Sequence, residues 1–197
     1  MEHFMHDNGG VLMAKLSFYH GVMGAGKSEE LMKIYRNYTR INREPVVFSY
    51  SADNRFGDDF GVHSRNGDYI SAIPFNKETQ FKSGLNIDVI MIDEGQFLTQ
   101  NQVYTLANLV DNYNIDVLVF GLRTDAFLNF FEGSKTLFEI SDKLIELKTL
   151  CAFCSNKAIV NGRFVNGKQV YSGSQIQIGD EEYKGLCRKH YMENKEN

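Results

Sequence analysis

The sequence lacks the features that would place the protein in a membrane or on nucleic acid. No apolar run reaches the roughly 20 residues that a membrane-spanning helix needs. Residues 1–12 lack the basic-then-apolar order of a secretory signal. The formal net charge of −4 does not attract nucleic acid or an anionic membrane to the surface as a whole. We therefore predict a cytoplasmic protein with no membrane partner and no nucleic-acid partner.

Cysteine is also scarce, and the three cysteines are an odd number crowded into the C-terminal region. An odd count argues against a disulfide framework and favours a metal site in a reducing compartment. The pairs Cys151-x-x-Cys154 and Cys187-x-x-His190 supply four ligands. Four such ligands close a tetrahedral Zn²⁺ site and leave no position for water, so the predicted zinc ion is structural. The alternative is a set of free thiols and a surface histidine.

Between residues 13 and 150, continuous apolar strands alternate with amphipathic helices. Helical spacing of apolar residues follows residue 28 and recurs after Thr99, which is a suitable N-cap. This pattern is typical of a parallel sheet that helices cover on both faces. Residues 51–68 are rich in Gly, Asp, Asn and Arg and are predicted to form one long loop. The strands are expected at residues 15–20, 46–48, 89–92 and 117–120.

The phosphate-binding pattern G-x-x-x-x-G-K-[ST] occurs between the first predicted strand and the first predicted helix. Glycines let consecutive backbone N–H groups turn toward an anion, and the start of the helix adds partial positive charge. Lys27 would reach the outer phosphates of a nucleotide, and the Ser28 hydroxyl would bind Mg²⁺. The alternative is a glycine-rich turn with an incidental lysine. The predicted ATP-binding loop consists of Gly21, Val22, Met23, Gly24, Ala25, Gly26, Lys27 and Ser28.

Two carboxylates, Asp93 and Glu94, follow the third of these predicted strands. Proteins with this phosphate loop place the carboxylate that holds Mg²⁺ at such a strand end, so Asp93 is the candidate. An alcohol that attacks a γ-phosphoryl group needs a base, and the adjacent Glu94 can act as one. The alternative is a solvated loop entrance. Gly95 and Gln96 complete the segment, and we assign them to the ATP site with the two carboxylates.

The predicted fold class is therefore α/β, with a parallel sheet of the P-loop NTPase type, flanked by helices, in residues 13–150. Residues 151–197 hold the zinc ligands, glycine-rich turns and strand-like pieces at 169–171 and 175–178. They carry too little apolar mass for an independent core, so we predict a small zinc-ribbon domain there. Residues 1–12 show no periodicity and are predicted to be a disordered leader.

Together with the phosphate loop, three further segments resemble the second type of thymidine kinase. These segments are Asp93-Glu94-Gly95-Gln96-Phe97, Gly121-Leu122-Arg123-Thr124-Asp125 and Cys187-Arg188-Lys189-His190. The resemblance extends from Met13 to Tyr191, and its most specific parts are the acidic segment and the zinc pairs. It implies a kinase that uses ATP and Mg²⁺, carries a C-terminal zinc-binding lasso domain and forms a homotetramer. It also implies inhibition by thymidine triphosphate (dTTP) and a place in nucleotide salvage for DNA synthesis.

The resemblance implies roles for individual residues as well. Glu94 would take the proton from the 5′-hydroxyl of thymidine, while Lys27 and Arg55, within an Asp53-x-Arg55 element, would stabilise the phosphates. Residues 175–183 would form a flexible loop that closes over thymidine and binds the base through main-chain groups. The implied thymidine-binding residues are Met23, Phe97, Phe131, Gln175, Ile176, Gln177, Ile178, Gly179 and Tyr183.

Two positions depart from the family pattern. Ala126 stands where the family has a phenylalanine after Gly-Leu-x-x-Asp, and Phe127 comes one place later. Gly95 replaces a common alanine, which is expected to loosen the backbone there.

These features predict a thymidine kinase that transfers the γ-phosphoryl group of ATP to the 5′-hydroxyl of thymidine, which yields thymidine monophosphate and ADP. Three alternatives stay open at this point. They are an ATPase whose zinc ribbon grips nucleic acid, a kinase for a different nucleoside or a nucleoside monophosphate, and a regulator that binds ATP without turnover.

Overall fold

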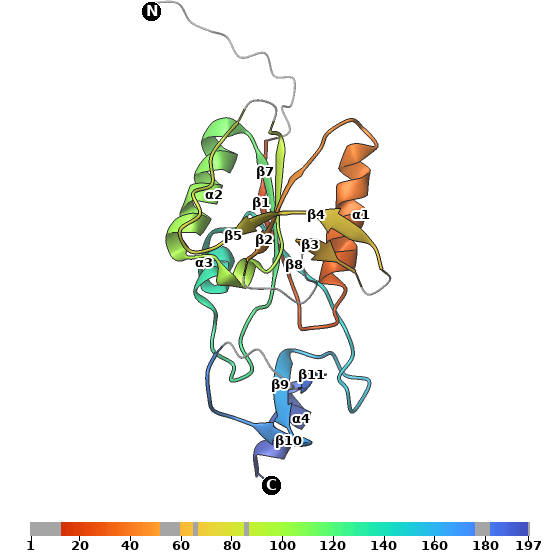
Figure 1. Ribbon diagram of the computed structural model, residues 1–197. Coiled ribbons are helices and arrows are strands. Elements are labelled where there is room, and N and C mark those ends of the chain that lie inside the picture. The colour runs from red at the N-terminus through yellow and green to blue at the C-terminus, as the bar shows by residue number, and fades with distance from the viewer. Residues whose placement is uncertain (1–12, 52–59, 65–66, 85–86, 176–181, 197) are drawn as a thin grey trace, which may run out of the picture.

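The computed structural model describes residues 13–51, 60–64, 67–84, 87–175 and 182–196. The leader predicted for residues 1–12 lies outside these ranges. Figure 1 shows a large sheet between helices and, below it, a small sheet with the C-terminal helix. We call residues 13–150 the α/β body and residues 151–196 the zinc module. Among the described residues, no helix is both long enough and apolar enough to span a bilayer.

The large sheet has six parallel strands in the order β5-β2-β6-β7-β1-β8, which confirms the predicted α/β architecture. Its strands are β1 (Leu16–His20), β2 (Val46–Tyr50), β5 (Ile73–Phe75), β6 (Val89–Ile92), β7 (Asp116–Gly121) and β8 (Lys143–Glu146). The four inner strands are those expected from the sequence. The sequence pattern does not identify the edge strands β5 and β8, because both are short and expose at least half of their residues.

Helices cover both faces of the large sheet (Figure 1), with α1 on one face and α2 and α3 on the other. Their bounds, with those of a short 3-10 helix, are α1 (Lys27–Thr39), η1 (Gly95–Phe97), α2 (Gln100–Tyr113) and α3 (Glu132–Ile140). The sequence of strand β6 is continuously apolar because helices cover the strand on both faces. Ile90 and Ile92 pack in the cluster under α2, and Val89 and Met91 pack in the cluster under α1. Because side chains alternate between faces, a strand covered on both sides needs apolar residues throughout.

The start of α2 follows the sequence expectation for a capped helix. The Thr99 hydroxyl accepts a hydrogen bond from the Gln102 N–H at 3.2 Å, and the Gln102 side chain accepts one from the Thr99 N–H at 3.0 Å. This reciprocal arrangement satisfies two N–H groups that the helix itself cannot pair. Val103 and Leu106, on the predicted apolar face, are fully buried.

The prediction of one long loop over residues 51–68 is wrong for its later part. Residues Gly61–His63 form β3, which pairs with β4 (Tyr69–Ser71) in an antiparallel hairpin. Composition alone misses this hairpin because only Val62 supplies a fully buried apolar side chain, and it packs with the cluster under α1. An ion pair of 2.9 Å between Arg36 of α1 and Asp68 also links the hairpin to the helix.

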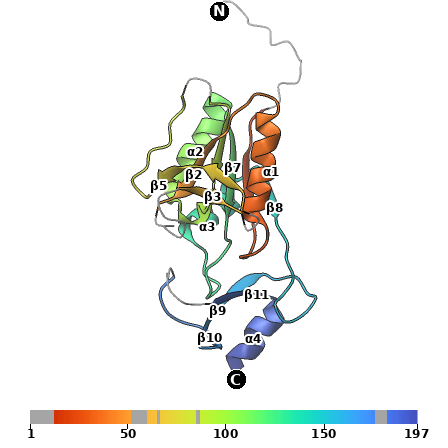
Figure 2. The same cartoon turned by 45° about the vertical axis from the view of Figure 1, so that its right-hand side comes forward.

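The zinc module contains a three-stranded antiparallel sheet in the order β10-β9-β11, followed by a helix (Figure 2). The bounds are β9 (Val160–Val165), β10 (Lys168–Val170), β11 (Glu182–Leu186) and α4 (Arg188–Glu196). Its apolar cluster comprises Cys151, Val160, Phe164, Leu186, Cys187 and Tyr191. The strand-like piece at 169–171 overlaps β10, whereas most of the piece at 175–178 lies outside the described residues.

Candidate active site and zinc site

The phosphate loop connects the end of β1 to the start of α1. A Cβ on Gly21 would lie 2.6 Å from the Leu147 carbonyl oxygen, so only glycine fits there. Gly26 has a φ of 78°, in the left-handed region that glycine adopts without strain. Gly26 is the N-cap of α1 and makes no side-chain hydrogen bond. A Ser or Asp N-cap would instead accept a hydrogen bond from an N–H group of the first helical turn. This arrangement suits an anion at the helix N-terminus.

The Lys27 side chain folds back over the loop, where its ammonium donates a hydrogen bond to the Val22 carbonyl at 3.1 Å. A second bond of 3.2 Å joins the Ala25 N–H to the same carbonyl. Ser28 is the second residue of α1 and is partly exposed. The lysine and the serine are therefore adjacent at the start of α1, where the phosphate loop ends.

The acidic segment begins where β6 ends. Asp93 is buried, and its carboxylate accepts a hydrogen bond of 3.0 Å from the Glu94 N–H. Glu94 has a φ of 55°, a left-handed conformation that is uncommon for residues other than glycine. The Gln96 side chain donates a hydrogen bond to the Glu94 carboxylate and accepts one of 2.9 Å from the Leu122 N–H. Gln96 thus fixes the Glu94 side chain against the end of β7.

Gly95 is a steric requirement of this segment. A Cβ at that position would lie 2.1 Å from Val119 Cγ1, closer than two carbon atoms can approach. The glycine that departs from the family pattern therefore accommodates the valine on β7.

Neighbouring strands bring these segments to one edge of the sheet. The strand order places β1 beside β7 and β7 beside β6, and the Gly21 N–H donates a 3.3 Å hydrogen bond to the Gly121 carbonyl. In parallel sheets, ligands usually bind beyond the carboxyl ends of the strands. Figure 1 shows that this edge faces the zinc module.

An aromatic wall stands beside the acidic segment. The ring of Phe97 lies 4.4 Å from that of Tyr50 and 5.7 Å from that of Phe131, measured between centroids. Next along the wall, Asp125 accepts backbone hydrogen bonds from Phe127 at 2.8 Å and Asn129 at 2.9 Å, which fixes a tight turn. Phe97 and Phe131, which the resemblance assigned to the thymidine site, are therefore neighbours in space.

Two residues that sequence analysis missed hold the zinc module against this edge. Asn161 accepts a 2.8 Å hydrogen bond from the Met23 N–H. Arg163 is buried, lies 5.0 Å from the ring centroid of Phe127, and donates hydrogen bonds of 3.2 Å to the carbonyls of Ser172 and Ser174. No local pattern marks either residue, because Met23 and Phe127 belong to the α/β body, and Ser172 and Ser174 are contacted only once the zinc module has folded.

The four predicted zinc ligands come together in the zinc module. Their ligand atoms all lie within 4.8 Å of one another. His190 Nδ1 lies 3.4 Å from the sulfurs of both Cys151 and Cys187, and the sulfurs of Cys154 and Cys187 are 3.9 Å apart. In a tetrahedral site with Zn–S bonds of about 2.3 Å, sulfurs lie about 3.8 Å apart, so the cluster fits zinc.

The thiols differ in how readily they release a proton. Burial opposes ionisation of Cys151, but the N–H groups of Cys187 and Phe153 and the side chain of His190 lower its pKa to about 6. The Asn156 N–H lowers the pKa of Cys154, but burial and the neighbouring Cys187 and Cys151 side chains raise it on balance. Since zinc binds thiolate, Cys151 is more ready than Cys154 to bind the metal near neutral pH.

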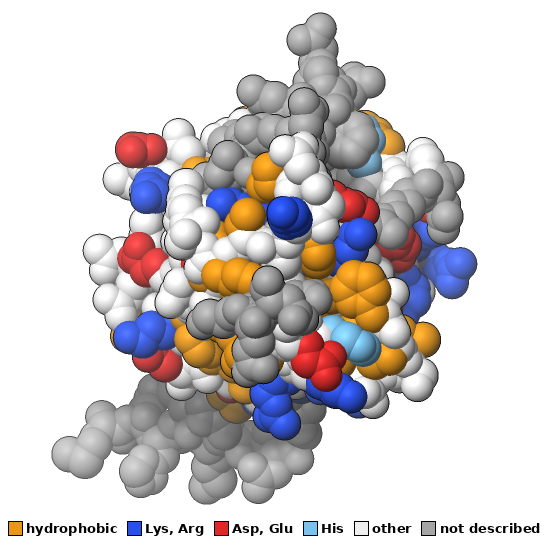
Figure 3. Space-filling view, turned by 90° about the horizontal axis from the view of Figure 1, so that it is seen from below, with side chains coloured by type: hydrophobic (Ala, Val, Ile, Leu, Met, Phe, Trp, Pro, Cys, Tyr) orange, Lys and Arg blue, Asp and Glu red, His pale blue; other side chains and the backbone are white. Residues whose placement is uncertain are grey.

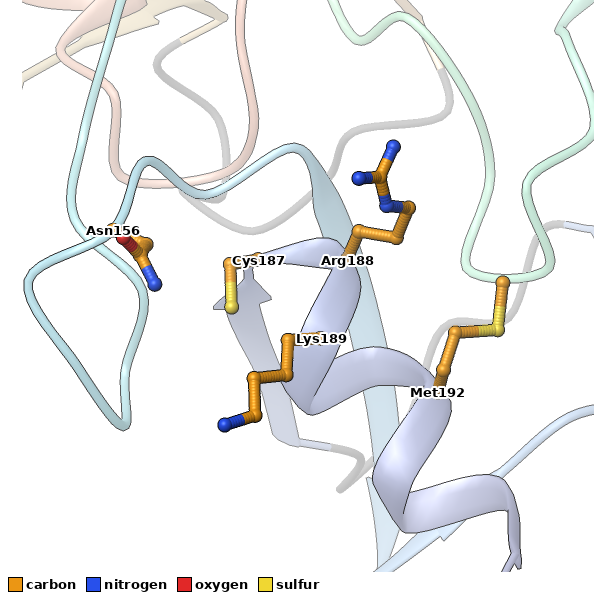
Figure 4. A pocket seen from close by; sticks show the side chains of 5 residues that line it. All are labelled: Asn156, Cys187, Arg188, Lys189 and Met192. Carbon is orange, nitrogen blue, oxygen red and sulfur yellow. The ribbon is translucent and has the colours of Figure 1, made fainter.

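A hollow beside α4 belongs to the zinc site. Figure 4 shows it lined by Asn156, Cys187, Arg188, Lys189 and Met192. None of the predicted ATP or thymidine residues lines it. Figure 3 shows the face at this end of the molecule, where basic, acidic and apolar side chains of the described residues are interspersed. This mixture differs from the continuous basic stripe expected of a nucleic-acid grip.

A family model described as thymidine kinase matches residues 14–191. The chain belongs to the thymidine kinase family. The thymidine kinase of Streptococcus pyogenes serotype M3 (strain MGAS315) is 43% identical over 187 residues, which cover 91% of this chain and 98% of that protein. The thymidine kinase of Streptococcus agalactiae serotype Ia is 42% identical over the same shares of both chains. The resemblance inferred from the sequence motifs is therefore confirmed.

Several residues that the thymidine kinase resemblance assigned lie outside the described part of the chain. They are Asp53, Arg55, Ile176, Gln177, Ile178 and Gly179. Two flanking residues are described: the Gln175 side chain donates a 3.4 Å hydrogen bond to the Phe130 carbonyl, and Tyr183 pairs with Arg163 across β11 and β9. The ends of the expected thymidine loop therefore lie beside the aromatic wall and Arg163.

Proposed function

We propose that the protein transfers the γ-phosphoryl group of ATP to the 5′-hydroxyl of thymidine, which yields thymidine monophosphate and ADP. One observation carries most of this proposal. The phosphate loop follows β1 and Glu94 follows β6, two strands that flank β7 and end at the same edge of the sheet, and Gln96 holds the Glu94 carboxylate in place. A base positioned beside bound ATP distinguishes a kinase from a protein that only binds the nucleotide.

Each of the assigned residues has a place in the proposed reaction. Glu94 accepts the proton of the attacking hydroxyl, and Lys27 and Arg55 stabilise charge on the phosphoryl group as it moves. Ser28 and Asp93 supply the oxygen ligands that Mg²⁺ prefers, and when bound the ion would neutralise charge on the phosphates. The other ATP-site residues are Gly21, Val22, Met23, Gly24, Ala25, Gly26, Gly95 and Gln96. Most of the catalysis is therefore positioning and electrostatics.

Thymidine lies between the aromatic wall and the zinc module in this proposal. Met23, Phe97 and Phe131 form the wall of the pocket, and Tyr183 packs on the sugar. Residues 175–179 bind the base through main-chain groups. The contact between Phe97 and Phe131 and the position of Gln175 beside Phe130 support this placement.

The family also suggests the setting in which the enzyme works. We propose a cytoplasmic homotetramer that serves nucleotide salvage and is inhibited by dTTP. Within each subunit, residues 13–150 form the nucleotide-binding domain, and residues 151–197 form the lasso domain around a structural zinc ion.

The base assignment is tested by Glu94→Gln, which keeps the shape of the side chain and a partner for Gln96 but cannot accept the proton. A general base contributes about 10²- to 10⁴-fold, so turnover should fall by at least about 100-fold while the Kd for ATP stays nearly unchanged. Turnover is followed as transfer of labelled phosphate from ATP to thymidine. A variant with near-normal turnover would show that another group takes the proton.

The choice of acceptor is tested with a panel of nucleosides and nucleoside monophosphates in the same assay. The proposal expects labelled thymidine monophosphate as the main product. A larger yield from another acceptor would identify that acceptor as the substrate. ATP hydrolysis that nucleic acid stimulates, with no labelled monophosphate, would favour an ATPase. ATP binding without any product would leave only a regulatory role.

A further inference from the structure

The zinc module contacts the phosphate loop directly. Asn161, on β9, is 4% exposed, and its side-chain oxygen lies 2.8 Å from the N–H of Met23. Met23 is the third residue of the loop and is separated from Asn161 by 138 positions. Figures 1 and 2 agree that β9 and β11 lie against this end of the α/β body.

The two parts are closely packed around this hydrogen bond. Gly185 pairs with Asn161 on the adjacent strand β11, and a Cβ on Gly185 would lie 3.4 Å from Val22 Cγ2. The Arg123 side chain donates a 3.0 Å hydrogen bond to the Ile159 carbonyl. The hollow between β1, β8 and β9 has a volume of only about 10 Å³. The start of the loop therefore packs against β9 and β11.

The phosphate loop needs such a support because its own backbone is permissive. Gly24 and Gly26 both adopt positive φ angles, of 74° and 78°. A loop with such glycines reaches many conformations, and those whose N–H groups do not converge bind phosphate poorly. A buried hydrogen bond that restricts the loop before ATP arrives reduces the ordering cost of binding.

We propose that Asn161 is a positioning residue that braces the phosphate loop, so that an ordered zinc module is required for full ATP affinity. The inference rests on the proposed binding of ATP at residues 21–28. In the proposed function, the zinc module already forms one side of the thymidine site. The inference gives it a second role, because β9 also supports the loop that receives the phosphates.

Asn161→Ala tests the brace, since it removes the acceptor of the Met23 N–H. A hydrogen bond of this kind is worth a factor of about 3 to 10 in an equilibrium constant, so the Kd for MgATP should rise by about that factor. Calorimetric titration without an acceptor nucleoside measures this Kd. Hydrogen exchange of peptides covering residues 21–28 should also become faster. The KM for ATP should rise more than kcat falls.

Lys157→Ala is the matched control. Lys157 belongs to the same module, and its ammonium pairs at 2.6 Å with Glu146, which lies outside the phosphate loop. Its loss should leave the ATP Kd within about twofold, since exposed ion pairs are worth little. The zinc content of every variant is measured to show that the module is intact. If Asn161→Ala loses zinc, Asn161→Ser replaces it, with the same expected rise in Kd from a shorter side chain.

The brace is refuted if the zinc-loaded Asn161 variant binds ATP and exchanges at residues 21–28 as the unaltered protein does. A rise confined to the KM for thymidine would also overturn the proposal, because Asn161 would then act on the thymidine site and not on the phosphate loop. Failure of the proposed function would give a different result. In that case the unaltered protein makes no thymidine monophosphate, whereas the Kd for ATP still differs between the unaltered protein and the Asn161 variant.

Discussion

In the α/β body, two large apolar clusters pack against opposite faces of the six-stranded sheet. In the zinc module, a single small cluster packs against three short strands, and two of its buried members, Cys151 and Cys187, belong to the Cys/His cluster that fits zinc. The body can thus be stabilised by burial of apolar surface alone. The module has too little such surface, so we expect its order to depend on the metal. Both parts nevertheless contribute to one proposed site.

Removal of zinc should show the largest difference between the two regions. Structural zinc contributes on the order of 10 kcal/mol to such small units, so a strong chelator should unfold the module and leave the large sheet intact. Hydrogen exchange should then accelerate across β9, β10 and β11 while β6 and β7 stay protected. Thymidine phosphorylation should be lost and should return when zinc is added back. Protected module strands in metal-free protein would show that the small core suffices.

Leu106→Ala should have the next largest effect, and in the opposite region. Leu106 is fully buried between α2 and the sheet, and its truncation should lower the free energy of unfolding by about 2 to 5 kcal/mol. Chemical denaturation followed by circular dichroism measures the change. Zinc content should stay unchanged, because Leu106 and the predicted zinc ligands belong to separate clusters. Loss of zinc in this variant would mean that the two regions fold as one unit.

Arg163→Lys should have a smaller effect that is confined to the acceptor side. Lysine keeps the charge but cannot reproduce the planar fork that binds Ser172 and Ser174 and stacks on Phe127. The KM for thymidine should rise roughly three- to tenfold, while the Kd for ATP stays unchanged. Steady-state kinetics and calorimetry separate the two. If ATP affinity fell instead, Arg163 would act on the phosphate loop as Asn161 is proposed to do.

Local pattern predicted those parts of the site whose residues are close in sequence. The phosphate loop follows from glycine spacing between a strand and a helix, and the zinc ligands follow from two pairs with a fixed separation. The inner strands β6 and β7 are recognisable because a strand buried on both faces is apolar at every position. The edge strands and the β3–β4 hairpin gave no such pattern, since their residues are largely exposed and their pairing partners set their structure.

The sequence by itself determined the inner strands of the sheet, the phosphate loop, the Cys/His cluster and, through its motifs, the thymidine kinase family. Only the tertiary structure placed Gln96 against Glu94 and Leu122, explained Gly95 by the position of Val119, and brought Asn161 to Met23. Motifs are read from neighbours along the chain, whereas these contacts join segments that meet only after the sheet and the zinc module have formed. That is why the residues that orient the site had no recognisable pattern in the sequence.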